Sequence, residues 1–147
     1  MNIDVTQTRI YKLRTYLMNI IKNINSNYKQ INANYLSDDP DNYSLDKIPT
    51  ASTVETWITG IEIHKDIFSF RSRMDYSAEM ISNLENIGFY ETFENIIYEK
   101  DKNKELPEID GIEKIECLNC GSMVSNETST AEFDIQLQIT YIVNEEE

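Results

Sequence analysis

The chain has 147 residues, of which 40% are hydrophobic, and it carries a formal net charge of -13. This length fits one domain, and the hydrophobic fraction is typical of a folded protein rather than of a disordered acidic one. An acidic surplus of this size disfavours nucleic acid and anionic membranes as equilibrium ligands.

No stretch approaches the roughly 20 apolar residues that a membrane-spanning helix needs. The polar start MNIDVTQTR also lacks the apolar region of a signal peptide, so we expect no membrane and a protein kept in a cytosol. The charge is uneven, because residues 1–30 hold five cations and one carboxylate and carry +4, which leaves -17 on residues 31–147. The five cations are Arg9, Lys12, Arg14, Lys22 and Lys29.

The first expected element is an amphipathic helix over residues 5–26. Its apolar positions fall on one face, and its other face carries the basic residues, either as a solvated surface or as a docking surface for an acidic neighbour. Asp4 with Gln7 is a capping pair for its first turn. The predicted buried face consists of Ile10, Leu13, Leu17, Ile20, Ile21 and Ile24.

A half-buried strand follows in QINANYLS, where apolar and polar residues alternate. The run DDPDN then predicts a turn. Beyond it, residues 36–53 are interpreted as a short return strand or as an extended arm laid across a neighbouring subunit. Tyr43, Leu45 and Ile48 are the candidate contact residues of this arm.

Residues 54–76 have a strand pattern, with Gly60 as a bend or bulge. The alternation places Arg71 and Arg73 on the same face of this strand, opposite Phe68 and Phe70. Two interpretations remain open for the arginines. They form either a solvated face or, as candidate interface residues, ion pairs with carboxylates of a neighbouring subunit.

A pair of helices is predicted next. Ser77 is a good cap for the first helix, and Gly88 fits the residue that ends it. The inner face of the first helix is expected to contain Met80, Ile81, Leu84 and Ile87. The second helix is expected to bury Phe89, Phe93, Ile96 and Ile97.

The end of the chain returns to strands after the polar loop EKDKNKELPEIDG. Strict alternation from Phe133 to Tyr141 predicts a long strand with one apolar and one polar face. Residues 144–147 are expected to form a mobile acidic tail. The whole chain is therefore predicted to be a single α+β domain, residues 1–147, in which an N-terminal helix and a central helix pair pack on a mostly antiparallel sheet.

Residues suited to catalysis are scarce. His64 is the only histidine, and the sequence has no glycine-rich phosphate loop, GxSxG or HExxH motif. Cys117 and Cys120 form one CxxC, but a structural zinc site needs four ligands, and His64 is the only further soft ligand. We expect no catalytic residues, no metal site, no cofactor and no enzymatic activity.

Several segments, taken together, resemble a family of small tail-completion or tail-terminator proteins of phages and defective prophages of Gram-positive bacteria. The most specific segment is NLENIGFYETFENII followed by LPEI, and the cysteine pair in CLNCG departs from the family pattern. The remaining segments are INANYLSDDPDNYSLDKIPT, FSFRSRMDYS, LPEIDGIEKIECL and AEFDIQLQITYI.

The resemblance implies a virion structural protein, assembled in a bacterial host cytoplasm, that forms a homohexameric ring. Its implied partners are other copies of itself, the tail tube protein and the head-tail connector protein. DNA is expected to pass the ring without specific binding, and an acidic lumen suits such passage. Two alternatives remain: a neighbouring connector or minor capsid component, and an acidic DNA mimic that blocks a nucleic-acid-binding host protein.

Overall fold

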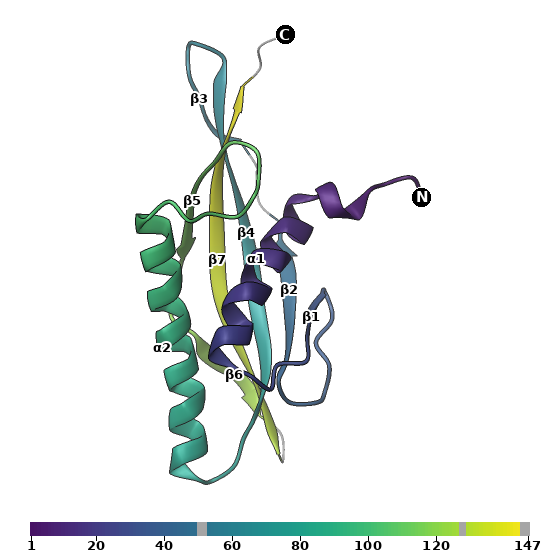
Figure 1. The fold of residues 1–147 in the computed structure, drawn as a ribbon, viewed down its shortest axis with the longest axis vertical. Coiled ribbons are helices and arrows are strands. Elements are labelled where there is room, and N and C mark those ends of the chain that lie inside the picture. Colours follow the sequence, from purple (N-terminus) through teal and green to yellow (C-terminus); the bar gives the residue numbers. More distant parts are fainter. Residues whose placement is uncertain (50–52, 127–128, 145–147) are drawn as a thin grey trace.

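The computed structural model describes residues 1–49, 53–126 and 129–144. Two long helices and one mixed sheet make up this part of the chain, and both helices lie on the same side of the sheet (Figure 1). The helices are α1 (Arg9–Ile24) and α2 (Met80–Lys102), preceded by the short 3-10 helix η1 (Val5–Gln7). The strands are β1 (Gln30–Ala33), β2 (Asn42–Ile48), β3 (Thr53–Thr56), β4 (Ile61–Asp75), β5 (Ile112–Cys117), β6 (Ser122–Asn126) and β7 (Thr130–Asn144).

The sheet has the order β1-β2-β4-β7-β5, with β3 pairing on β4 and β6 pairing on β7. Among the strands of the described residues, the β1–β2 pair is parallel and the other pairs are antiparallel. β4 and β7 are the longest strands and pair along their whole lengths, from Ile61 opposite Asn144 to Asp75 opposite Thr130. The predicted fold class, a mostly antiparallel α+β sheet with an N-terminal helix, is confirmed.

The core lies between the sheet and the two helices. The apolar stripe of α1 supplies Leu13, Leu17 and Ile21, and all three are fully buried. The apolar residues that alternate along β7 are buried in the same core, so the predicted apolar face of this strand is confirmed. The buried side chains of the sheet include Tyr43, Phe68, Phe70, Ile135 and Leu137, and α2 contributes Phe89, Phe93 and Ile97.

The predicted central helix pair is wrong, because α2 is one continuous helix that runs through Gly88. A glycine inside a helix costs about 1 kcal/mol relative to alanine, which does not by itself end the helix. Because the helix is continuous, the apolar side chains of its first two turns point away from the sheet. Met80, Ile81, Leu84 and Ile87, which were predicted to face inward, are therefore 55–71% exposed.

Three further expectations change in detail. The segment 54–76 is not one bent strand but a hairpin, in which β3 and β4 are joined by a turn with Gly60 at a φ of +86°. Of the arm expected over residues 36–53, the first part is a loop that leads into β2, and β2 lies inside the sheet between β1 and β4, while residues 50–52 lie outside the described part. Of the expected tail, Asn144 ends β7, and residues 145–147 lie outside the described part.

Within the described residues, no helix is both long enough and apolar enough to cross a membrane.

Candidate functional site

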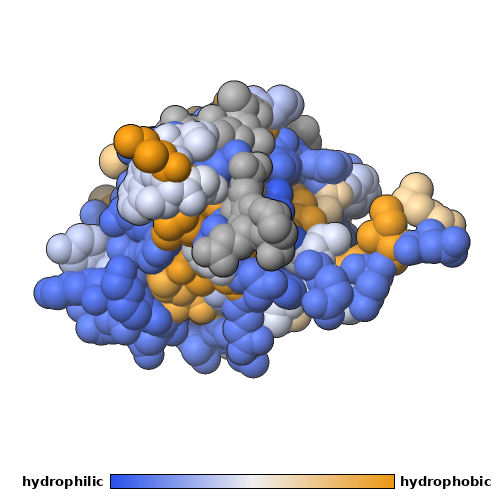
Figure 2. Space-filling model, turned by 90° about the horizontal axis from the view of Figure 1, so that it is seen from above, coloured by the Kyte–Doolittle hydropathy of each residue, from blue (hydrophilic) through white to orange (hydrophobic). Residues whose placement is uncertain are grey.

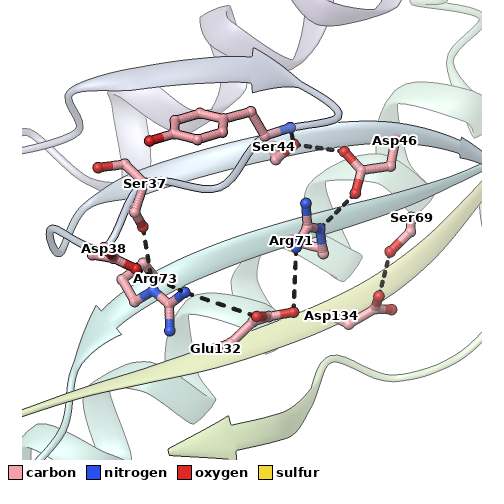
Figure 3. A network of polar contacts seen from close by, with 10 residues as sticks. Ser37, Asp38, Ser44, Asp46, Ser69, Arg71, Arg73, Glu132 and Asp134 are labelled. Carbon is pink, nitrogen blue, oxygen red and sulfur yellow. Dashed lines mark hydrogen bonds and ion pairs between the residues drawn. The ribbon is translucent and has the colours of Figure 1, made fainter. Parts of the chain in front are cut away.

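The face of the sheet opposite the helices carries a network of charged side chains from three strands (Figure 3). Strand register brings them together, because Ser44 on β2 lies opposite Arg71 on β4, and Arg73 lies opposite Glu132 on β7. Asp46 is two residues beyond Ser44 and points to the same face. We call Asp38, Asp46, Arg71, Arg73 and Glu132 the arginine network.

Arg71 lies at the centre of this network. Its Nε donates to Oδ2 of Asp46 at 2.5 Å, and its Nη1 is 3.6 Å from Oε2 of Glu132. The hydroxyl of Ser44 donates to the other oxygen of Asp46 at 2.6 Å. The three charged side chains are only 18–24% exposed. Partial burial strengthens such ion pairs relative to pairs in open solvent, so these contacts tie β2, β4 and β7 together.

Arg73 is more deeply buried, with 8% of its side chain exposed. The loop of residues 34–41 folds over it. The Nε of Arg73 donates to the carbonyl oxygen of Ser37 at 3.3 Å, and its Nη2 is 3.9 Å from carboxylate oxygens of both Asp38 and Glu132. Figure 3 shows these contacts converging on one guanidinium group. Arg73 therefore holds this loop against the sheet.

The charge of the network decides what it can bind. Two guanidinium groups face three carboxylates, so the arginines are neutralised within their own chain. Next to them, Asp134 accepts a hydrogen bond from the hydroxyl of Ser69 and adds a further negative charge. This surface does not attract phosphate groups or acidic side chains. Arg71 and Arg73 therefore have carboxylate partners within their own chain, and a contact with a neighbouring subunit stays a prediction.

Two of the other candidate interface residues lie on the face of the sheet that the helices cover. Tyr43 and Leu45 are fully buried under the helices, so neither side chain is available to a neighbouring subunit. The ring of Tyr43 stacks on Phe70, and its hydroxyl accepts a hydrogen bond from Asn25 at 3.0 Å. Ile48 lies on the face with the arginine network and is half-buried. The sequence pattern did not show which side of β2 would meet the core.

A second charged cluster, which the sequence reasoning missed, lies on the helix-covered face. Asp66 is 1% exposed, and its carboxylate meets Nε of Arg9 at 2.8 Å and Nζ of Lys47 at 3.5 Å. The hydroxyl of Tyr141 donates a hydrogen bond to this carboxylate at 3.3 Å. Burial raises the pKa of Tyr141, and the negative charge of Asp66 raises it further. The contact fastens the first residue of α1 to β4. The sequence did contain a signal for this cluster, because alternation along the strand places Asp66 on the same face as the apolar Phe68.

His64 borders the Asp66 cluster through Tyr141, whereas the two cysteines lie near the β5–β6 connection. The Nε2 of His64 is 2.8 Å from Oε1 of Glu62, and its ring stacks on Tyr141. Cys117 is half-buried near the end of β5, whereas Cys120 is exposed in the turn before β6. Across residues 1–49, 53–126 and 129–144, no group of three or more His, Cys, Asp or Glu side chains is arranged to hold a metal ion.

The two thiols are expected to react at very different rates. Burial, with smaller contributions from Glu94 and Glu116, raises the pKa of the Cys117 thiol to about 12. Because the thiolate is the nucleophile, iodoacetamide near neutral pH should modify Cys120 and leave Cys117 largely unmodified. Peptide mass spectrometry of a labelling time course measures both rates. Unfolding in denaturant is the control and should equalise them, whereas equal rates in the folded protein would contradict the described burial.

Comparison of the chain with models of known protein families and with curated proteins finds no match.

Proposed function

We propose that the chain is a structural subunit of a phage-like particle, one copy of a ring that ends the tail tube and joins it to the head connector. The observation that carries the proposal is the resemblance to tail-completion proteins. Its most specific segment, residues 83–97, lies within α2. The LPEI segment, residues 106–109, lies in the loop between α2 and β5, and AEFDIQLQITYI lies within β7. The resemblance thus falls on the elements that build the core.

The surface of the fold supports an assembly role in two ways. The helices cover one face of the sheet (Figure 1). The other face carries half-buried charged and polar side chains, and among the described residues no helix lies over it, although the loop of residues 34–41 covers Arg73. Large apolar side chains are also exposed on α2 and at the tip of the β3–β4 hairpin, where Trp57 is 45% exposed and Ile58 fully exposed. Exposed apolar groups of this size are typical of protein–protein contact surfaces.

The charge of the chain suits DNA passage. Residues 31–147 carry -17, and the two arginines of the open face are neutralised by their neighbours. A strongly acidic lumen repels phosphate groups, so DNA crosses such a ring without a tight complex. The same charge supports the alternative of an acidic DNA mimic, which is an outcome of the experiment below.

The test is to add the purified protein to purified tail tubes of the particle whose genes surround its own. Negative-stain electron microscopy and co-sedimentation should show rings at one tube end and a halt in further tube growth. Empty head portals are the matched comparison. Filling of portals rather than capping of tubes would assign the chain to the connector. Failure to bind either, together with a salt-sensitive complex with a host nucleic-acid-binding protein, would replace the proposal with the DNA mimic.

A further inference from the structure

Two edges of the sheet are capped by side chains of the helices. A strand edge carries unpaired N–H and C=O groups that pair readily with another chain, so proteins usually cap such an edge or place charge on it. On the β1 edge, Nε of Arg14 in α1 donates to the carbonyl oxygen of Ile31 at 2.6 Å. On the β5 edge, the N–H of Ile115 donates to Oδ1 of Asp101 in α2 at 3.0 Å. Backbone groups at both edges are therefore already in use.

β7 is protected in the gap between its partners β5 and β6. The N–H of Leu118 donates to the carbonyl oxygen of Gln136 at 2.8 Å, and the N–H of Gln136 donates to Oδ1 of Asn119 at 2.9 Å. The loop that joins β5 to β6 thus satisfies the part of β7 that neither strand covers. At the opposite end of the sheet, the short strand β3 carries the charge of Glu55. Figure 2 looks onto that end, where apolar residues show among hydrophilic ones.

β6 lacks these protections. All five of its residues are exposed, and within the part of the chain that the structure describes β7 is its only strand partner. In that part its backbone forms no hydrogen bond to a side chain or to a loop, and its sequence SMVSN has no charge and no proline. A register shift at Val124 is its one protective feature. Met123 and Val124 are 46% and 59% exposed. We call the outer side of Ser122–Asn126 the β6 edge.

The chemical complement of a strand edge is another extended strand. We propose that the β6 edge of one copy pairs antiparallel with the β6 edge of a second copy about a two-fold axis. A two-fold contact needs one uncapped edge, whereas head-to-tail pairing needs two, and the β1 and β5 edges are capped.

The absence of charge on β6 also favours a second copy as the partner. Two chains that each carry a net charge of -13 repel one another, and residues near a two-fold axis meet their own copies. A charged residue there would face a like charge, whereas Ser122–Asn126 contains none. The exposed side chains of Met123 and Val124 would then form apolar pairs across the axis.

This inference goes beyond the proposed tail role and does not rest on it. Pairing of the β6 edges joins the seven-stranded sheets of two copies into one sheet. In a ring, a two-fold contact of this kind joins one ring to a second ring. Figure 1 shows β6 beside β7, at the end of the sheet opposite the β3–β4 hairpin, so the contact would leave that hairpin accessible.

The test follows the purified full chain as its concentration rises, by analytical ultracentrifugation and by amide hydrogen exchange. A dimer should form, and where it dominates, the outward amides of residues 122–126 should exchange at least about tenfold more slowly, because new hydrogen bonds protect them. Amides of β1 are the internal control and should not change. Met123→Lys with Val124→Lys should weaken association at least about tenfold, because it places like charges opposite each other. Leu118→Lys is the matched control, since Leu118 is 41% exposed but lies outside β6.

Each result supports or overturns the inference. A chain that stays monomeric overturns it, as does a dimer in which residues 122–126 remain unprotected. Normal association of the Met123/Val124 variant with an unchanged circular dichroism spectrum also overturns it, as does an equal loss in Leu118→Lys. Protection of β6 that appears only with tail tubes would replace self-pairing by pairing with a tube protein. The tail role is tested separately, because capping of tubes by the Met123/Val124 variant would leave that role standing even if the pairing fails.

Discussion

Replacing Phe93 by alanine is expected to lower the free energy of unfolding by about 3–5 kcal/mol, because it leaves a cavity in the centre of the core. Phe93 is fully buried, and its ring stacks on Phe70 at 5.3 Å between centroids. The cavity is expected to persist because the neighbouring aromatic rings are held by several contacts of their own. Phe89 also stacks on the ring of Phe93, at 6.2 Å. Urea denaturation followed by circular dichroism measures the loss.

Leu84→Ala is the matched control, because Leu84 lies in the same helix but is 56% exposed. Leucine and alanine have similar helix propensities, so this change is expected to cost less than about 1 kcal/mol. The measurement should be made at low protein concentration, because any self-association through exposed apolar side chains of α2 would add apparent stability. Similar losses for the two variants would mean that both stripes of α2 are buried, as a helix broken at Gly88 would allow.

The second large effect is expected from the double change Arg71→Glu with Arg73→Glu, which should lower the free energy of unfolding by about 3–5 kcal/mol. The two new carboxylates would face Asp46, Asp38 and Glu132, which already lie within 4 Å of the guanidinium groups. Like charges in a partly buried cluster repel strongly, and the loop over Arg73 would lose its anchor. Urea denaturation at low and moderate salt measures the loss, and salt should reduce it in part.

Lys65→Glu is the control for this charge reversal. Lys65 lies on the same strand and the same face as Arg71, but it forms no ion pair among the described residues. Its reversal is expected to change stability by less than about 0.5 kcal/mol. If the double arginine variant is as stable as the wild type, the arginines are solvated and the network does not hold the sheet. Loss of assembly with unchanged stability would support their interpretation as contacts between subunits.

The sequence by itself determined the features that depend on local periodicity. Alternation along residues 133–141 identified both the strand β7 and its buried face, because side chains of a strand point to opposite sides in turn. The spacing of Leu13, Leu17 and Ile21 did the same for α1. From these patterns, and from their order along the chain, the α+β class with a mostly antiparallel sheet followed.

Only the tertiary structure decided which patterned faces are buried and which side chains meet. Both stripes of α2 are equally apolar in sequence, and packing against the sheet selected the one that contains Phe93. Tyr43 lies in the core because β2 pairs with β4 in a register that points it toward the helices. Register also brings Arg71 to Glu132 across sixty residues of sequence. Periodicity shows which residues share a face, but pairing and burial depend on contacts between distant segments, which no local pattern specifies.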